Sequence, residues 1–146
     1  MWQRFTERAR RVVFYAQEEA GKYGDSEVSP EHMLLGLLRD RDTTADRVMS
    51  AMGVDPPVLR AEVEEKVPRG PGVSPRDEFS LTNRAKRVID LAYDEARALN
   101  NNYIGTEHLL LAFARDKDGL VGAVLGGAGL EVELVRQAAA QAQAGE

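Results

Sequence analysis

The feature that most constrains the fold of this chain is an internal repeat. When the sequence is shifted by 76 positions, FTERARRV at 5–12 lies on LTNRAKRV at 81–88, and PEHMLLGLLRD at 30–40 lies on TEHLLLAFARD at 106–116. No gap is needed, and roughly 18 of about 57 aligned positions are identical, which indicates duplication of one structural unit. We expect one copy at 1–66 and the other at 80–146, joined by an exposed linker at 67–79 that is rich in proline and glycine.

Both copies carry the pattern of four short helices. Apolar residues recur at helical spacing, and no stretch alternates as a half-buried strand does. Threonine or serine caps predict helices that start at Thr6, at Ser29 and, in copy two, at Thr106. A third helix is expected at 45–52 and a fourth after Asp55. The expected core positions of the two fourth helices are Val58, Leu59 and Val63, and Leu134, Val135 and Ala139.

Helices this short are marginal in isolation, so their apolar faces must pack against one another. The sequence therefore predicts an all-α fold of two tandem four-helix repeats, packed with pseudo-twofold symmetry. One local conflict is the third helix of copy two, where glycine predicts either a loose helix or close packing on a neighbour. The glycines concerned are Gly119, Gly122, Gly126 and Gly127.

Composition narrows the classes of function. The net charge of −5 argues against a nucleic-acid binder, because such proteins usually present a basic face. The absence of cysteine excludes disulfides and thiolate metal sites. No apolar run approaches the ~18 residues of a membrane span, and the first residues lack the apolar stretch of a signal peptide. We therefore expect a cytoplasmic protein that binds neither nucleic acid nor membrane.

Motifs for catalysis are missing from the sequence. There is no G-x-x-x-x-G-K-[ST] loop for phosphates and no H-E-x-x-H pair for zinc. The two histidines, His32 and His108, belong to different copies, so we expect them to pack or hydrogen-bond locally. These observations predict a binding module that is not an enzyme and has no metal or cofactor.

One polar constellation does recur in both copies. A threonine at a helix start suits an anion, because backbone N–H groups there are unpaired and the helix dipole is positive. A glutamate in the first turn of another helix can bind a guanidinium through paired hydrogen bonds. The alternative is structural: threonine as a cap, glutamate against the dipole, and arginines paired with nearby acids. The residues are Thr6, Arg8, Arg11 and Glu31, matched by Thr82, Arg84, Arg87 and Glu107.

The segments FTERARRV…SPEHMLLGLLRD and LTNRAKRV…NNYIGTEHLLLAFARD together resemble the double Clp-N motif, over about residues 3–143. This motif forms the amino-terminal domain of the Clp protein unfoldases, and the likeness is closest to the ClpC type. The resemblance implies an all-α domain that recruits protein substrates and adaptor proteins to a hexameric Clp ATPase, which feeds a ClpP-type protease. An alternative is a stand-alone Clp-N protein that acts as adaptor, decoy or regulator.

In ClpC proteins of some bacteria the resembled domain also binds phosphorylated arginine, a mark for degradation. By this resemblance Thr82 and Glu107, and Thr6 and Glu31, are the expected ligand-binding residues. Arg8, Arg84, Arg11 and Arg87 are expected to support them. Copy two is favoured, because it keeps Gly105-Thr106 ahead of its glutamate, whereas copy one has Ser29-Pro30.

Overall fold

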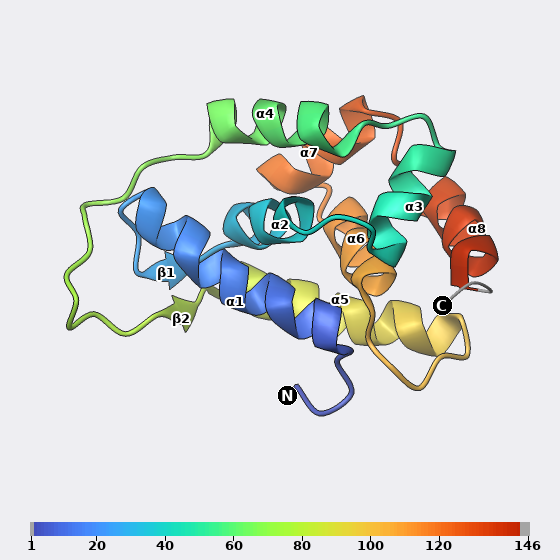
Figure 1. Cartoon of the computed structure of the whole chain (residues 1–146), viewed down its shortest axis with the longest axis horizontal. Helices are drawn as coiled ribbons and strands as arrows, with labels where there is room; N and C mark the ends of the chain where they lie inside the picture. Colours follow the sequence, from blue (N-terminus) through green and yellow to red (C-terminus); the bar gives the residue numbers. More distant parts are fainter. Residues whose placement is uncertain (1, 144–146) are drawn as a thin grey trace.

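The computed structural model describes residues 2–143, which form eight helices and two very short strands (Figure 1). The first copy contains α1 (Glu7–Lys22), β1 (Glu27–Val28), α2 (Pro30–Arg39), α3 (Thr44–Ala51) and α4 (Pro56–Lys66). The second contains β2 (Ser80–Leu81), α5 (Asn83–Ala98), α6 (Thr106–Arg115), α7 (Leu120–Gly127) and α8 (Val132–Ala142). The predicted all-α fold of two four-helix repeats is confirmed.

The starts of the long helices follow the sequence signals closely. Thr6 and Thr82 share the same extended backbone, and each hydroxyl accepts a hydrogen bond from the amide three residues later. Ser29 caps α2 ahead of a proline in the first turn, where the missing N–H costs nothing. The third helix of copy one ends before Gly53, which has a φ of 75°.

Three details of the sequence prediction are wrong. Thr106 is the first residue of α6 and Gly105 is its cap; the Thr106 hydroxyl instead accepts a bond from the amide of Ala45 in α3. Val58 and Leu134 are 65% and 48% exposed and lie outside the core, because Leu59 and Val63, and Val135 and Ala139, already fill the inward face of each fourth helix.

The two short strands pair one copy with the other, which the sequence did not reveal. β1 of copy one pairs in parallel with β2, which precedes the first helix of copy two. The reciprocal bridge joins Phe5, ahead of α1, to Ile104, ahead of α6. Each copy therefore hydrogen-bonds the start of its first helix to the other copy, and the two halves are interlocked.

The helices pack in three layers. The buried helices α2 and α6 lie between α1 and α5 on one side and α4 and α7 on the other, with α3 and α8 grouped at one end (Figure 1). Contacts between copies are paired: α3 packs on α8 as α7 packs on α4. The largest fully buried side chains, including Met33, Leu34, Leu110 and Phe113, come mostly from the central layer. One continuous core therefore spans both copies.

The segment between α4 and β2 is mostly exposed, and its first part is attached to the end of α1. The amides of Gly70 and Gly72 donate to the carbonyls of Tyr23 and Gly24, at 2.8 and 2.7 Å. The Arg69 guanidinium lies over the Tyr23 ring. These contacts hold the segment beside the α1–β1 turn.

The glycines of copy two fall into two groups. A Cβ on Gly119 or Gly122 would collide with the α6–α7 turn or with Arg84, so close packing explains these two. A Cβ on Gly126 or Gly127 would meet nothing within 4 Å. The last two glycines therefore weaken α7 without any packing reason.

Candidate functional site

The threonines and glutamates singled out by the sequence do not meet within one copy. α1 has 16 residues and is about 24 Å long, and α2 runs back along it. Thr6 at the start of α1 and Glu31 at the start of α2 therefore lie at opposite ends of this helix pair. The same geometry separates Thr82 from Glu107 along α5.

The strand exchange brings the groups together across the copies instead. The Thr82 amide donates to the carbonyl of Val28 at 3.0 Å, which places the start of α5 beside the start of α2 and Glu31. Likewise, the Thr6 amide donates to the carbonyl of Ile104 at 2.9 Å, beside Glu107. We call these regions the α5 site (Thr82, Arg84, Arg87 and Glu31) and the α1 site (Thr6, Arg8, Arg11 and Glu107).

At the α5 site the arginines flank an open cavity of about 490 Å³, lined by Arg84, Arg87, Arg115, Asp116, Lys117 and Asp118. Arg84 donates to Asp116 at 2.8 Å, and this carboxylate is the main cause of the raised pKa of Arg84, to which Glu31 also contributes. The cavity is therefore lined by more cations than acids, next to the amino end of a helix.

Two of these cations have no ion pair within residues 2–143, namely Arg87 and Lys117. In copy one their counterparts are paired: Arg11 with Glu7 at 3.4 Å, and Arg41 with Asp46 at 2.9 Å. Copy two has Asn83 and Gly122 at the positions of those two acids. Loss of the acids leaves positive charge available for an anion.

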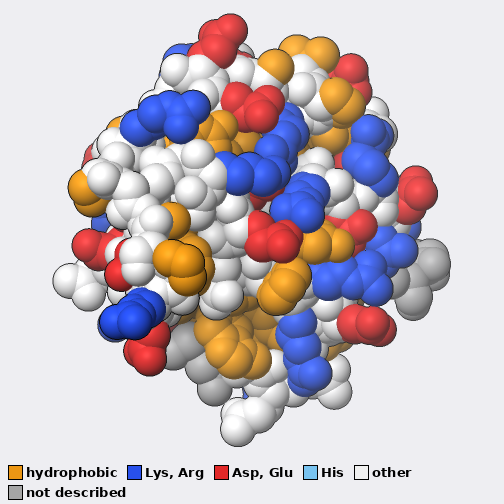
Figure 2. Space-filling model, turned by 60° about the vertical axis from the view of Figure 1, so that its left-hand side comes forward, with side chains coloured by type: hydrophobic (Ala, Val, Ile, Leu, Met, Phe, Trp, Pro, Cys, Tyr) orange, Lys and Arg blue, Asp and Glu red, His pale blue; other side chains and the backbone are white. Residues whose placement is uncertain are grey.

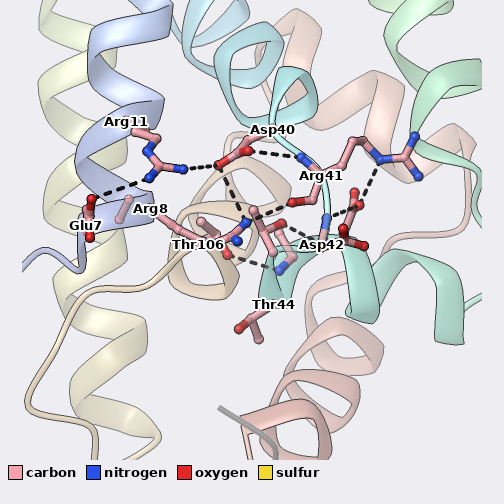
Figure 3. Close-up of polar contacts among 12 residues, drawn as sticks. Glu7, Arg8, Arg11, Asp40, Arg41, Asp42, Thr44 and Thr106 are labelled. Atoms are coloured by element: carbon pink, nitrogen blue, oxygen red, sulfur yellow. Dashed lines mark hydrogen bonds and ion pairs between the residues drawn. The ribbon is translucent and has the colours of Figure 1, made fainter.

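At the α1 site the arginines are internally satisfied (Figure 3). Arg8 donates to the carbonyl of Arg41 at 2.8 Å and lies 3.8 Å from Asp40, while Arg11 lies 3.6 Å from the same carboxylate. The structural alternative raised by the sequence, in which arginines near a helix start pair with nearby acids, describes this site well.

The two glutamates differ sharply. Glu31 is partly exposed, and its carboxylate makes no hydrogen bond or ion pair with the residues that the structure describes. Glu107 is 0% exposed; its Oε2 accepts from Tyr103 at 3.2 Å and from Gln143 at 3.0 Å, while its Oε1 has no partner. The carboxylate of the α5 site is open, and that of the α1 site is enclosed.

Both histidines are buried and act locally. The Nδ1 of His108 accepts from the amide of Gly105 at 2.8 Å, so its protonated Nε2 faces Asn101 at 2.8 Å. Burial lowers the pKa of His108 to about 4 and also lowers the pKa of His32. Both side chains are neutral at pH 7 and brace the start of the second helix of their copy.

Sequence reasoning missed a buried carboxylate that occurs once in each copy. Glu95 of α5 is bonded by Arg136 at 2.7 Å and by Arg115 at 3.0 Å, and these arginines lower its pKa. In copy one, burial alone raises the pKa of Glu19, but Arg60 and Lys22 outweigh it and lower the net value. Both glutamates and their arginine partners recur at the 76-residue offset, and this recurrence is the signal in the sequence that could have pointed to them.

Within residues 2–143, no helix is both long enough and apolar enough to cross a bilayer. No cluster of three or more metal-binding side chains occurs in that range. The face in Figure 2 shows basic and acidic groups interspersed, with smaller hydrophobic patches between them.

Comparison with known proteins agrees with this architecture. Residues 4–142 match the family described as Clp repeat N-terminal domain. Over 94% of its length the chain is 41% identical to the negative regulator of genetic competence ClpC/MecB of Bacillus subtilis, and 39% identical to the chaperone protein ClpB of Oceanobacillus iheyensis. The chain spans 17% of the length of either relative.

Solved structures give the same result. The N-terminal domain of ClpD from Arabidopsis thaliana matches with a TM-score of 0.71 and 28% identity, covering 99% of this chain and 97% of that one. The Hsp104 N-terminal domain from Candida albicans matches with a TM-score of 0.77 at 19% identity, covering 99% and 94%, which supports the fold alone. The interlocked repeats and these matches together show that the chain belongs to the Clp repeat N-terminal domain family.

Proposed function

We propose that this chain is the substrate- and adaptor-recognition domain of a Clp-type ATP-dependent unfoldase and protease system, and that it binds proteins carrying phosphoarginine. The observation that carries the second part is the α5 site. There an open basic cavity and an unpaired carboxylate lie beside the same helix start.

The chemistry of that site matches a ligand with two opposite charges. Thr82 uses its oxygen to cap α5, which leaves its hydroxyl hydrogen and the first amides of the helix for a phosphate. Arg87 and Lys117 add positive charge, and neither has an ion-pair partner within residues 2–143. Glu31 supplies the acceptor for a guanidinium.

The α1 site is the weaker candidate on the same grounds. Its arginines are bonded to Asp40, Glu7 and a backbone carbonyl, and its carboxylate is enclosed. We therefore place the main site at Thr82 and Glu31, which revises the sequence-based preference for Thr82 with Glu107.

Titration calorimetry with free phosphoarginine tests the proposal. We expect binding by the wild-type chain and a loss of about tenfold or more in Glu31→Gln, because a charge-assisted pair is removed. Glu65→Gln changes the same charge on the exposed face of α4 and should bind as wild type does. Absence of binding, or equal losses in both variants, contradicts the proposal.

Recognition of tagged proteins is tested separately. One protein is prepared with and without phosphorylation on arginine, and both forms are titrated against the chain. The tagged form should bind, and its binding should weaken in Glu31→Gln. The untagged form should show no binding that depends on Glu31. The stand-alone alternative is distinguished by the mass of the endogenous protein on an immunoblot, since a fused ATPase makes the band several times heavier.

A further inference from the structure

Glu107 is an unusual residue, because it is a fully enclosed carboxylate that forms no ion pair with any residue of the described range 2–143. Its Oε2 accepts two hydrogen bonds from neutral donors, and its Oε1 accepts none. Gly105 makes this position possible, since a Cβ there would collide with Oε1. Burying a charged group with an unfilled acceptor is costly, so the arrangement calls for a functional explanation.

The covering group is the last residue of the described chain. Gln143, at the end of α8, donates from Nε2 to Glu107 at 3.0 Å and to Asn101 Oδ1 at 2.7 Å. A side-chain amide presents two N–H groups from one planar nitrogen, as each terminal nitrogen of a guanidinium does. Gln143 therefore gives Glu107 one planar N–H donor, as one terminal nitrogen of an arginine would, but without the charge.

We propose that Gln143 is an internal occupant of the α1 site, which closes that site by taking the position on Glu107 that the guanidinium of a ligand would take. This inference rests on the proposed function, and it concerns the regulation of the second site. Displacement of the end of α8 would expose a carboxylate that already lies beside the amino end of α1.

The first copy supports this interpretation by contrast. The position equivalent to Gln143 is Val67, which is buried and has no side-chain donor. The equivalent carboxylate, Glu31, has no partner within the described chain and is partly exposed. The closed site thus has a donor at the end of the fourth helix that the open site lacks, besides Tyr103, whose position in copy one is Glu27.

Closure is measured first, without any ligand. The intact chain is treated with a water-soluble carbodiimide and glycine ethyl ester, and labelled carboxyls are mapped by mass spectrometry. We expect Glu107 to be nearly unlabelled in wild type and labelled about tenfold more in Gln143→Ala, because that factor matches about 1.4 kcal/mol of lost hydrogen bonding. Glu31 should be labelled equally in both proteins and serves as the internal standard.

Gln141→Ala is the matched control, because Gln141 is exposed on the same helix. It should leave Glu107 unlabelled. Tyr103→Phe removes the other donor to Oε2 but not the cover, and should raise labelling less than Gln143→Ala does. Equal labelling of Glu107 in wild type and Gln143→Ala, with both folded by circular dichroism, overturns the inference.

Calorimetry then measures the consequence for binding. In a Glu31→Gln background, Gln143→Ala should raise the affinity for phosphoarginine about tenfold, and adding Glu107→Gln should remove the gain. A Gln143→Ala variant with labelled Glu107 but unchanged affinity contradicts the role of Gln143 as an occupant. If phosphoarginine binds neither wild type nor any variant, the proposed function fails, while the labelling result still decides whether Gln143 closes the site.

Discussion

The amide of Thr82 donates to the carbonyl of Val28 at 3.0 Å, although the two residues belong to different copies. This bond places the start of α5 against the start of α2. It determines which threonine, arginines and carboxylate share a site, and it makes the α5 site a product of both repeats.

The positive charge of the α5 site can be reduced by restoring an acid found in copy one. Asn83→Glu places a carboxylate four residues before Arg87, as Glu7 precedes Arg11. We expect a roughly fivefold loss of phosphoarginine affinity by calorimetry, since an exposed pair is worth about 1 kcal/mol. An acid in the first turn favours the helix, so the melting temperature should not fall. Asn83→Gln, the neutral control, should bind normally.

The carboxylate of Glu95 depends on its arginines. Arg136→Ala removes the donors at 2.7 and 2.8 Å and leaves a buried charge with Arg115 alone. We expect the free energy of unfolding to fall by about 3 kcal/mol in urea titrations. Arg97→Ala breaks only an exposed pair with Asp94 and should change it by less than about 0.5 kcal/mol. Similar losses in both variants would mean that the Glu95 carboxylate does not need Arg136 in spite of its burial.

His108 should make the fold sensitive to mild acid. Burial lowers its pKa from the ordinary 6.5 to about 4 in the folded chain, so the unfolded chain binds protons more readily as pH falls below 6.5. We expect about 1.5 kcal/mol of stability to be lost between pH 6.5 and pH 5 through this residue. Urea titrations of His108→Gln should show a flatter pH dependence than wild type does. An unchanged slope would assign the acid sensitivity elsewhere.

Replacement of two glycines of α7 by alanine should change the stability of the fold in opposite directions. Gly126→Ala adds a methyl group in open space and should raise stability by about 0.5–1 kcal/mol. Gly122→Ala puts the same group against the backbone carbonyl of Asp116 and should lower stability by about 1–3 kcal/mol. Thermal unfolding monitored by circular dichroism checks both, and a shift in the same direction for the two would refute the packing difference.

Much of the fold is predictable because its signals are local. The caps at Thr6 and Ser29 and the stop at Gly53 depend only on neighbouring residues. The pairing of Thr82 with Glu31 is not local, since it arises from two-residue strands that are too short to show any periodicity.

Burial of charge left only an indirect signal in the sequence. Glutamates on a helix are usually solvated, so the recurrence of Glu19 and Glu95 with their arginines at the repeat offset indicated a shared role but not an enclosed position. Glu107 accepts a hydrogen bond from Gln143, which is 36 residues away along the chain, so no local pattern could predict this contact.

The reciprocal strand pairing also bears on how such a molecule is assembled. A polypeptide of half this length would leave the backbone groups before its first helix to water, and could bond them to protein by docking onto a second identical molecule. Two such molecules would form a closed, symmetric dimer in which each partner hydrogen-bonds the same backbone segment of the other. The present chain has the geometry of that dimer, with the two halves joined covalently. Because the halves are no longer identical, their two sites can differ in charge and in exposure to solvent while the backbone pairing stays the same.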